Sequence, residues 1–193
     1  MRRLDGNAPV QYVEHPVPES LRAHVAGLWH LRDTEPTCQV QTIYPDGFCE
    51  LIAHFAAPPQ CLEGREFRPQ GRTLFAAQRL GAVRLRRQHA LDCFGVRLRP
   101  EASSLLGTDV LRQSRERILD LANIDAPLSR RLHAAALSFV AGDTAKLERL
   151  LRARCASHSI DESVAQAVAC IRGSGGQMRI ESVARAAGCS LRS

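Results

Sequence analysis

Two ionisable side chains share one face of an apolar segment in the first half of the chain. Residues 48–55 carry Glu50 and His54 among apolar neighbours. Because side chains alternate along a β-strand, both would project to the same side as Ile52, while Leu51 points to the other side. A small-molecule pocket combines a few polar groups with an apolar wall, so this face predicts a binding site if it turns inward. If the Leu51 face turns inward instead, Glu50 is solvated.

Two further side chains join this candidate site from other predicted strands. Trp29 lies in the alternating segment 25–32, a neighbouring predicted strand. Arg97, in the segment 93–99, would be able to hold an anionic ligand through two parallel hydrogen bonds. Structural roles remain open for all of them: a solvated or structurally paired Glu50 and His54, a core position for Trp29, and a solvated strand face for Arg97. The candidate ligand-binding residues are Trp29, Glu50, His54 and Arg97.

The sequence carries none of the short motifs that are typical of metal or covalent chemistry. The seven histidines form no HxH pair, and the seven cysteines form no CxxC pair or cysteine and histidine cluster at zinc spacing. A GxSxG motif and a glycine-rich phosphate loop are also absent from the sequence. We therefore expect no metal, no cofactor and no enzymatic activity, although a Ser, His and Asp brought together from distant positions is left open.

Short alternating segments cut by turns dominate the chain up to Pro100. About six strands are expected, at residues 25–32, 40–44, 48–55, 73–77, 82–87 and 93–99. The turn residues Pro45, Asp46 and Gly47 predict a hairpin that joins the second and third of these segments. Regular short strands with this punctuation are typical of an antiparallel barrel or sandwich.

Beyond Pro100 the apolar residues recur at helical spacing. Short helices are expected at 101–106 and 115–122, followed by a longer pair that Gly142 separates, and by helices at 161–172 and 180–187. The pair carries apolar stripes, Leu128 to Phe139 and Leu147 to Leu151, which either the β-domain or a second protomer must cover. The second alternative predicts a homodimer with two-fold symmetry.

Composition is that of a folded protein. The chain has 193 residues, 45% of them hydrophobic, and a formal net charge of +6. Only Lys146 among its 26 basic residues is lysine, which indicates a general preference for arginine rather than a selected phosphate-binding surface. The first residues lack the apolar core of a secretory signal, and no apolar run approaches the ~20 residues that span a bilayer. We expect a cytoplasmic protein with no membrane segment.

A helix-turn-helix pattern lies near the carboxyl end. Residues 180–190 place the small residue Ala184 where two helices would cross and Gly188 where the chain would turn, as an ordinary helical hairpin end also does. The stretch resembles the first helix-turn-helix of the AraC family of bacterial transcription regulators, with residues 161–172 as the lead helix of that module. The DNA-binding residues that the resemblance implies are Arg185, Ser190 and Arg192.

The amino-terminal part carries a second resemblance. Residues 44–52 (YPDGFCELI) and 94–102 (FGVRLRPEA) are similar to two signature stretches of a poorly characterised sensor domain that precedes such DNA-binding modules. The expected fold is α+β: an amino-terminal barrel-like antiparallel β-domain, a helical pair and a partial three-helix helix-turn-helix segment. The expected domains are a β sensor domain at 1–125, a helical pair for linkage or dimerisation at 126–157, and an incomplete AraC-type DNA-binding domain at 158–193.

The resemblance implies the function of a transcription regulator. An unknown small-molecule effector would bind the β-domain and change the arrangement of two protomers on DNA. The alternative is a small cupin-like barrel enzyme or a stand-alone small-molecule-binding module. Because the sequence ends at Ser193, before a recognition helix is complete, we expect DNA binding in the complete regulator but no sequence-specific binding by these 193 residues alone.

Overall fold

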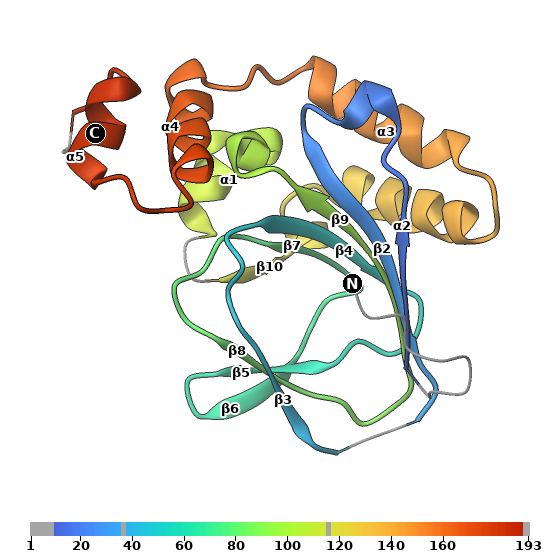
Figure 1. Cartoon of the computed structure of the whole chain (residues 1–193). Coiled ribbons are helices and arrows are strands. Elements are labelled where there is room, and N and C mark those ends of the chain that lie inside the picture. Colours follow the sequence, from blue (N-terminus) through green and yellow to red (C-terminus); the bar gives the residue numbers. More distant parts are fainter. Residues whose placement is uncertain (1–9, 36–37, 115–116, 191–193) are drawn as a thin grey trace.

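The computed structural model describes residues 10–35, 38–114 and 117–190, and two antiparallel sheets form its centre (Figure 1). The larger sheet has the strand order β1-β2-β9-β4-β7-β10. The smaller sheet has the order β3-β8-β5-β6. The strands of the larger sheet are β1 Val10–His15, β2 Val25–Asp33, β4 Cys49–His54, β7 Thr73–Ala76, β9 Leu91–Leu98 and β10 Ile118–Asp120. Those of the smaller sheet are β3 Val40–Ile43, β5 Gln60–Glu63, β6 Glu66–Pro69 and β8 Val83–Arg86.

The six predicted strand segments all form strands, but the described residues make two separate sheets rather than a closed barrel. The predicted hairpin at Pro45 to Gly47 is wrong, because β3 pairs with β8 in the smaller sheet while β4 pairs with β7 and β9 in the larger one. A turn does form at these residues. Asp46 accepts a hydrogen bond from the Phe48 amide, and Gly47 has a φ of 80°. The turn therefore carries the chain from one sheet to the other.

The larger sheet is covered on both faces because its strands alternate between two apolar environments. Leu51 of β4, Phe75 of β7 and Val96 of β9 point to one face and are almost fully buried. Helices α2 (Ala126–Val140) and α3 (Ala145–Ala156) lie over this face, and the smaller sheet lies on the other side (Figure 1). The result is a three-layer arrangement of helices, sheet and sheet.

The two long helices begin and end where the sequence indicates. Asp125 accepts a hydrogen bond from the Leu128 amide at the start of α2, and Gly142 follows its end with a φ of 100°, which favours glycine. Their predicted apolar stripes, from Leu128 to Phe139 and from Leu147 to Leu151, pack into the hydrophobic core, where α2 contacts the larger sheet and α3 contacts α2 and η1 (Glu19–Leu21). These stripes therefore need no second protomer to cover them, and the homodimer stays a prediction without that argument.

Shorter helices complete the chain. They are η1 Glu19–Leu21, η2 Pro100–Leu106, α1 Thr108–Gln113, η3 Leu121–Asn123, α4 Glu162–Gly173 and α5 Ile180–Ala186. The helix expected at 115–122 is wrong at Ile118–Asp120, which is strand β10 and pairs with β7, whereas Leu121 and Ala122 lie in η3. The three-domain division stays a prediction, and the buried core contains residues on both sides of position 125. Within the described residues, no helix combines the length and the apolar character that crossing a membrane requires.

Candidate functional site

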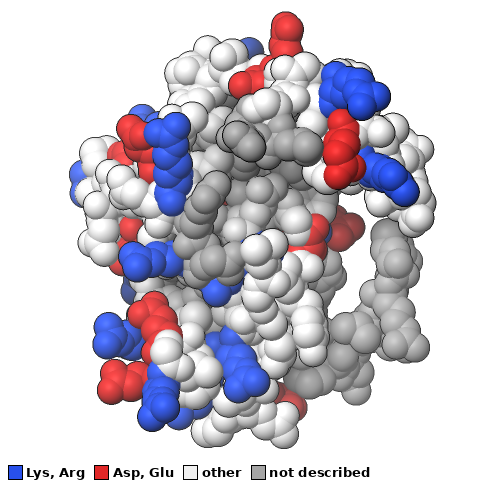
Figure 2. Space-filling view, turned by 90° about the vertical axis from the view of Figure 1, so that its left-hand side faces the viewer, with Lys and Arg blue, Asp and Glu red and all other residues white. Residues whose placement is uncertain are grey.

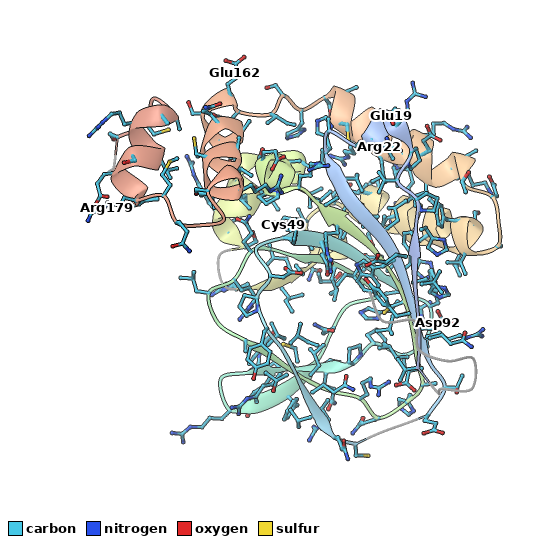
Figure 3. All side chains as sticks on the ribbon, viewed as in Figure 1. Glu19, Arg22, Cys49, Asp92, Glu162 and Arg179 are labelled. Carbon is cyan, nitrogen blue, oxygen red and sulfur yellow. The ribbon has the colours of Figure 1, made fainter. Side chains whose placement is uncertain are left out.

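A cavity of about 280 Å³ lies between the two sheets. Its floor consists of alternate side chains from four adjacent strands of the larger sheet, and its roof comes from β3 and β8. Figure 3 labels Cys49 and Asp92, the sequence neighbours of the floor residues Glu50 and Cys93, which lie toward opposite ends of the paired strands β4 and β9. The four side chains that the sequence suggested for ligand binding all line this cavity: Trp29, Glu50, His54 and Arg97.

Glu50 is the centre of the polar network at one end of the floor. Its Oε1 atom accepts hydrogen bonds from Trp29 Nε1 and from Arg97 Nε, both at 3.0 Å. The side chain is 18% exposed, so its charge is largely removed from bulk water and compensated by Arg97. Within the described part of the chain both donors reach the same oxygen, which leaves Oε2 with capacity to accept from a ligand.

Gly95 makes room for the tryptophan in this network. It lies on β9 directly opposite Trp29 of β2 and Ile52 of β4. A Cβ atom added at Gly95 would come within 2.0 Å of Trp29 Cε2, so the indole lies flat against the glycine backbone. Gly95 was not among the predicted site residues, although a glycine inside an apolar strand is the usual signal for such a close approach.

Arg97 is held by two carboxylates rather than left free for an anion. Besides Glu50, the Asp46 carboxylate lies 3.5 Å from its Nη2 atom, and its guanidinium carbon stands 5.4 Å from the centre of the Phe48 ring. Burial alone would lower the pKa of Arg97, but the attractions of Glu50, Asp46 and Tyr12 together outweigh it and the pKa is raised. An anionic ligand would have to compete with both carboxylates for this guanidinium.

His54 lies at the opposite end of the floor, two residues beyond Ile52 on the same face. It is 4% exposed, and neither of its ring nitrogens has a hydrogen-bond partner among the described residues. Burial lowers the pKa of His54 to about 4, so the imidazole is neutral at physiological pH. A neutral imidazole presents one donor and one acceptor.

A buried ion pair that sequence analysis missed closes this end of the cavity. Arg87, a lining residue, places Nη1 2.6 Å from Oδ2 of Asp33, and both side chains are 6% exposed. Asp33 ends β2 on the same face as Trp29 and Leu31, so the alternation that selected Trp29 also indicated its position. The sequence did not indicate its partner, because Arg87 directly follows β8, a strand of the other sheet.

The predicted DNA-binding end of the chain forms the two expected helices. The Asp161 side chain accepts a hydrogen bond from the Val164 amide at the start of α4, and Gly188 follows α5 with a φ of 67°. Arg185 and Ser190 are exposed, whereas Arg192 lies outside the described residues. On the side of the molecule drawn in Figure 2, basic and acidic side chains are interspersed rather than gathered into one basic patch.

In the described ranges no group of three or more His, Cys, Asp or Glu side chains is arranged to hold an ion.

The fold and the cavity together define a class: a two-sheet α+β domain with a ligand-sized cavity and a helix pair attached beside it. No family model matches the sequence. No curated protein matches it either. Among solved structures, the chain is similar to the crystal structure of the AraC-like transcriptional activator CuxR, with a TM-score of 0.46 and 12% identity, covering 94% of this chain and 77% of that one. The likeness is coarse and assigns neither a family nor a function.

Proposed function

We propose that this chain is the effector-sensing part of an AraC-like transcription regulator and binds a small molecule between its two sheets. The observation that carries the proposal is the cavity itself, where an apolar floor brings Trp29, Glu50 and His54 together. Ligand sites are concave, mostly apolar and fitted with a few convergent polar groups, and this cavity has that character. The resemblance of residues 180–190 to a helix-turn-helix supplies the regulatory part of the proposal.

The path of the chain supports a link between the cavity and the helix pair. Strand β9 carries Arg97 on the cavity floor and continues directly into η2. Glu101 of η2 accepts a hydrogen bond from Arg172 of α4 at 3.5 Å, and α4 packs on η2. Figure 1 shows α4 and α5 beside this end of the sheet. A ligand that hydrogen-bonds to Glu50 would alter the ion pair between Glu50 and Arg97. A resulting shift of β9 would be transmitted through η2 to α4.

Exposed apolar side chains on α4 support a DNA-binding module in this region. Val164 and Ile171 are 42% and 44% exposed, and their spacing of seven residues puts them on one helix face. In a three-helix unit such a face packs against another helix. The proposed response is a change in the placement of α4 and α5, and through it in the arrangement of two protomers on paired DNA half-sites.

The complete reading frame tests the proposal. It is expected to continue beyond Ser193 into a recognition helix and a second helix-turn-helix, and the complete protein is expected to occupy discrete chromosomal sites in chromatin immunoprecipitation. Expression from a promoter at such a site is then compared for the wild type, Glu50→Gln, and Ala76→Leu, which fills the cavity from β7. Glu63→Gln and Ala134→Leu, at exposed positions outside the cavity, are the matched controls.

Both cavity variants are expected to change promoter output severalfold, while the controls retain the wild-type level. A complete protein that occupies no chromosomal site contradicts the regulatory role. Occupancy with an unchanged output in both cavity variants contradicts the sensing role. Binding rather than catalysis is proposed for the cavity, so a bound compound is expected to be recovered chemically unchanged after incubation with the protein.

A further inference from the structure

The charges around the cavity balance. Three carboxylates stand against three guanidinium groups among its described lining residues and their direct partners: Asp33, Asp46, Glu50, Arg79, Arg87 and Arg97. The two most buried pairs, Glu50 with Arg97 and Asp33 with Arg87, are already in ion-pair contact. A charged ligand that approaches either pair would have to be desolvated, and it would compete for a charge that is already engaged.

His54, at the far end of the cavity floor, requires a hydrogen-bonding group on the ligand. Its side chain is more than nine-tenths buried and lines the cavity, and both ring nitrogens lack a partner among the described residues. A buried polar group without a hydrogen bond is unfavourable, and a ligand that carries a hydroxyl or N–H group removes that cost. Because burial lowers the pKa of His54 to about 4, the ring meets such a ligand as a neutral donor and acceptor.

The remaining lining residues and the volume of the cavity determine the polarity and the size of the ligand's main scaffold. Between the polar groups the wall is aliphatic, from Leu31, Ile52 and Leu74 on the floor to Ile43, Val83 and Leu85 on the roof. Its 280 Å³ is about twice the ~150 Å³ apolar cavity that accepts benzene in a well-studied protein. The space therefore fits one or two carbon rings.

We propose that the cavity selects an uncharged, largely apolar ligand of one or two rings whose hydroxyl or N–H group hydrogen-bonds to His54. The proposal rests on the proposed function for its biological role, while binding itself is measurable on the 193-residue chain. A further polar contact for the ligand is Glu50 Oε2, which is able to accept a hydrogen bond from a donor on the ligand.

The chain carries its own reporter for the test. Trp29 is its only tryptophan and lines the cavity, so its fluorescence responds to occupancy. The probes are matched series on two scaffolds, cyclohexane and decahydronaphthalene, each bearing a hydroxymethyl, a carboxylate or an aminomethyl group. None of them absorbs where tryptophan is excited. Affinities from fluorescence titration at neutral pH are confirmed by calorimetry on the same samples.

At least one alcohol is expected to bind about tenfold or more tightly than the carboxylate and the ammonium compound on its scaffold, a preference that reflects the missing free countercharge. His54→Leu is expected to reduce the affinity for that alcohol about tenfold, and His54→Gln, which keeps a donor and an acceptor, to restore most of it. His89→Leu, at an exposed position that is not among the residues lining the cavity, is the matched control. Circular dichroism verifies that each variant is folded.

Tighter binding of a charged member, equal binding of all three groups, or no binding in either series would overturn the proposal. So would an unchanged affinity for the alcohol in folded His54→Leu. These results are independent of the promoter experiment: alcohols that bind while the promoter stays silent refute the regulatory role alone, and a promoter response with a preference for charged probes refutes the ligand class alone.

Discussion

Among the described residues, the His54 side chain is buried with neither ring nitrogen in a hydrogen bond, which packing alone does not explain. An imidazole shut away from water without a partner for either nitrogen destabilises the folded state, and an aliphatic side chain of similar size would not. The same property suits a binding site, since the ligand supplies the missing hydrogen bonds. Stability and recognition thus oppose each other at this one position.

The pH dependence of stability follows from the same burial. The pKa of His54 is lowered by burial to about 4, against ~6.5 in an unfolded chain, so the unfolded state takes up this proton first as the pH falls. The folded state is expected to lose about 3 kcal/mol from this residue between roughly pH 6.5 and pH 4, and none of it above pH 7.

The measurement is urea unfolding of the wild type and His54→Leu at several pH values in that interval. The difference between the two free energies of unfolding isolates His54, since other groups such as His15, whose pKa burial also lowers, contribute to both proteins. A difference that stays constant from pH 7 to pH 4 would contradict the prediction.

Alternation along a strand was enough to place Glu50 and His54 on one face, and their position among apolar neighbours suggested that this face is enclosed. It was not enough to find their partners. The pairing of Trp29 with Glu50 depends on Gly95 lying between them, and the pairing of Asp33 with Arg87 depends on contact between two sheets. Both depend on which strands are neighbours, and a single sequence with short strands does not specify that.

Among the secondary-structure elements, the long helices were the most predictable and strand pairing the least. The spacing of Leu128, Leu132 and Phe139 specifies α2 because a period of 3.6 residues has no other common explanation. The turn at Pro45 to Gly47 specifies a local reversal only, and here the chain uses it to change sheets. Strands β5 and β6 are short and rich in polar residues, so no apolar pattern indicated them.

Helix α2 is expected to tolerate substitutions on its exposed face but not on the face that packs in the core. Leu132 is 1% exposed and packs in the core, so Leu132→Ala is expected to reduce the free energy of unfolding by about 2 to 5 kcal/mol. Leu137 on the same helix is 44% exposed, and Leu137→Ala is expected to change it by less than about 0.5 kcal/mol.

Chemical denaturation of both variants checks this difference, and sedimentation shows whether either variant changes the oligomeric state. A folded Leu132→Ala protein that loses only self-association would restore the argument for a dimer through the apolar stripe. Loss of stability without such a change supports the packing of α2 on the sheet.

At the scale of the whole molecule, the helix pair α4 and α5 is attached far less firmly than α2 and α3. The described part of α4 contains no fully buried residue, and Arg172 and Glu101 form its ion pair with η2. Arg172 is 43% exposed, so the pair contributes at most about 1 kcal/mol. A weak attachment of this kind is suited to an element that moves in response to a ligand.

Glu101→Gln is expected to speed amide hydrogen exchange in α4 severalfold without changing the unfolding of the sheet core. Arg172→Gln in the Glu101→Gln background is expected to add nothing further, because the two groups act as one pair. Arg152→Gln, at an exposed position on α3, is the matched control. Additive effects of the two substitutions, or equal effects in the control, would show that the ion pair does not hold α4.

The alternation of the four floor strands also affects how this protein can evolve. Neighbouring positions such as Leu51 and Ile52, or Gly95 and Val96, face opposite layers, one the helices and the other the cavity. Mutations at every second position therefore change what the cavity accepts, and those between them change stability. Selection for a new ligand can change the codons of the cavity-facing positions while purifying selection conserves the codons of the positions between them. Sequence variation among relatives is therefore expected to alternate from one residue to the next along β2, β4, β7 and β9.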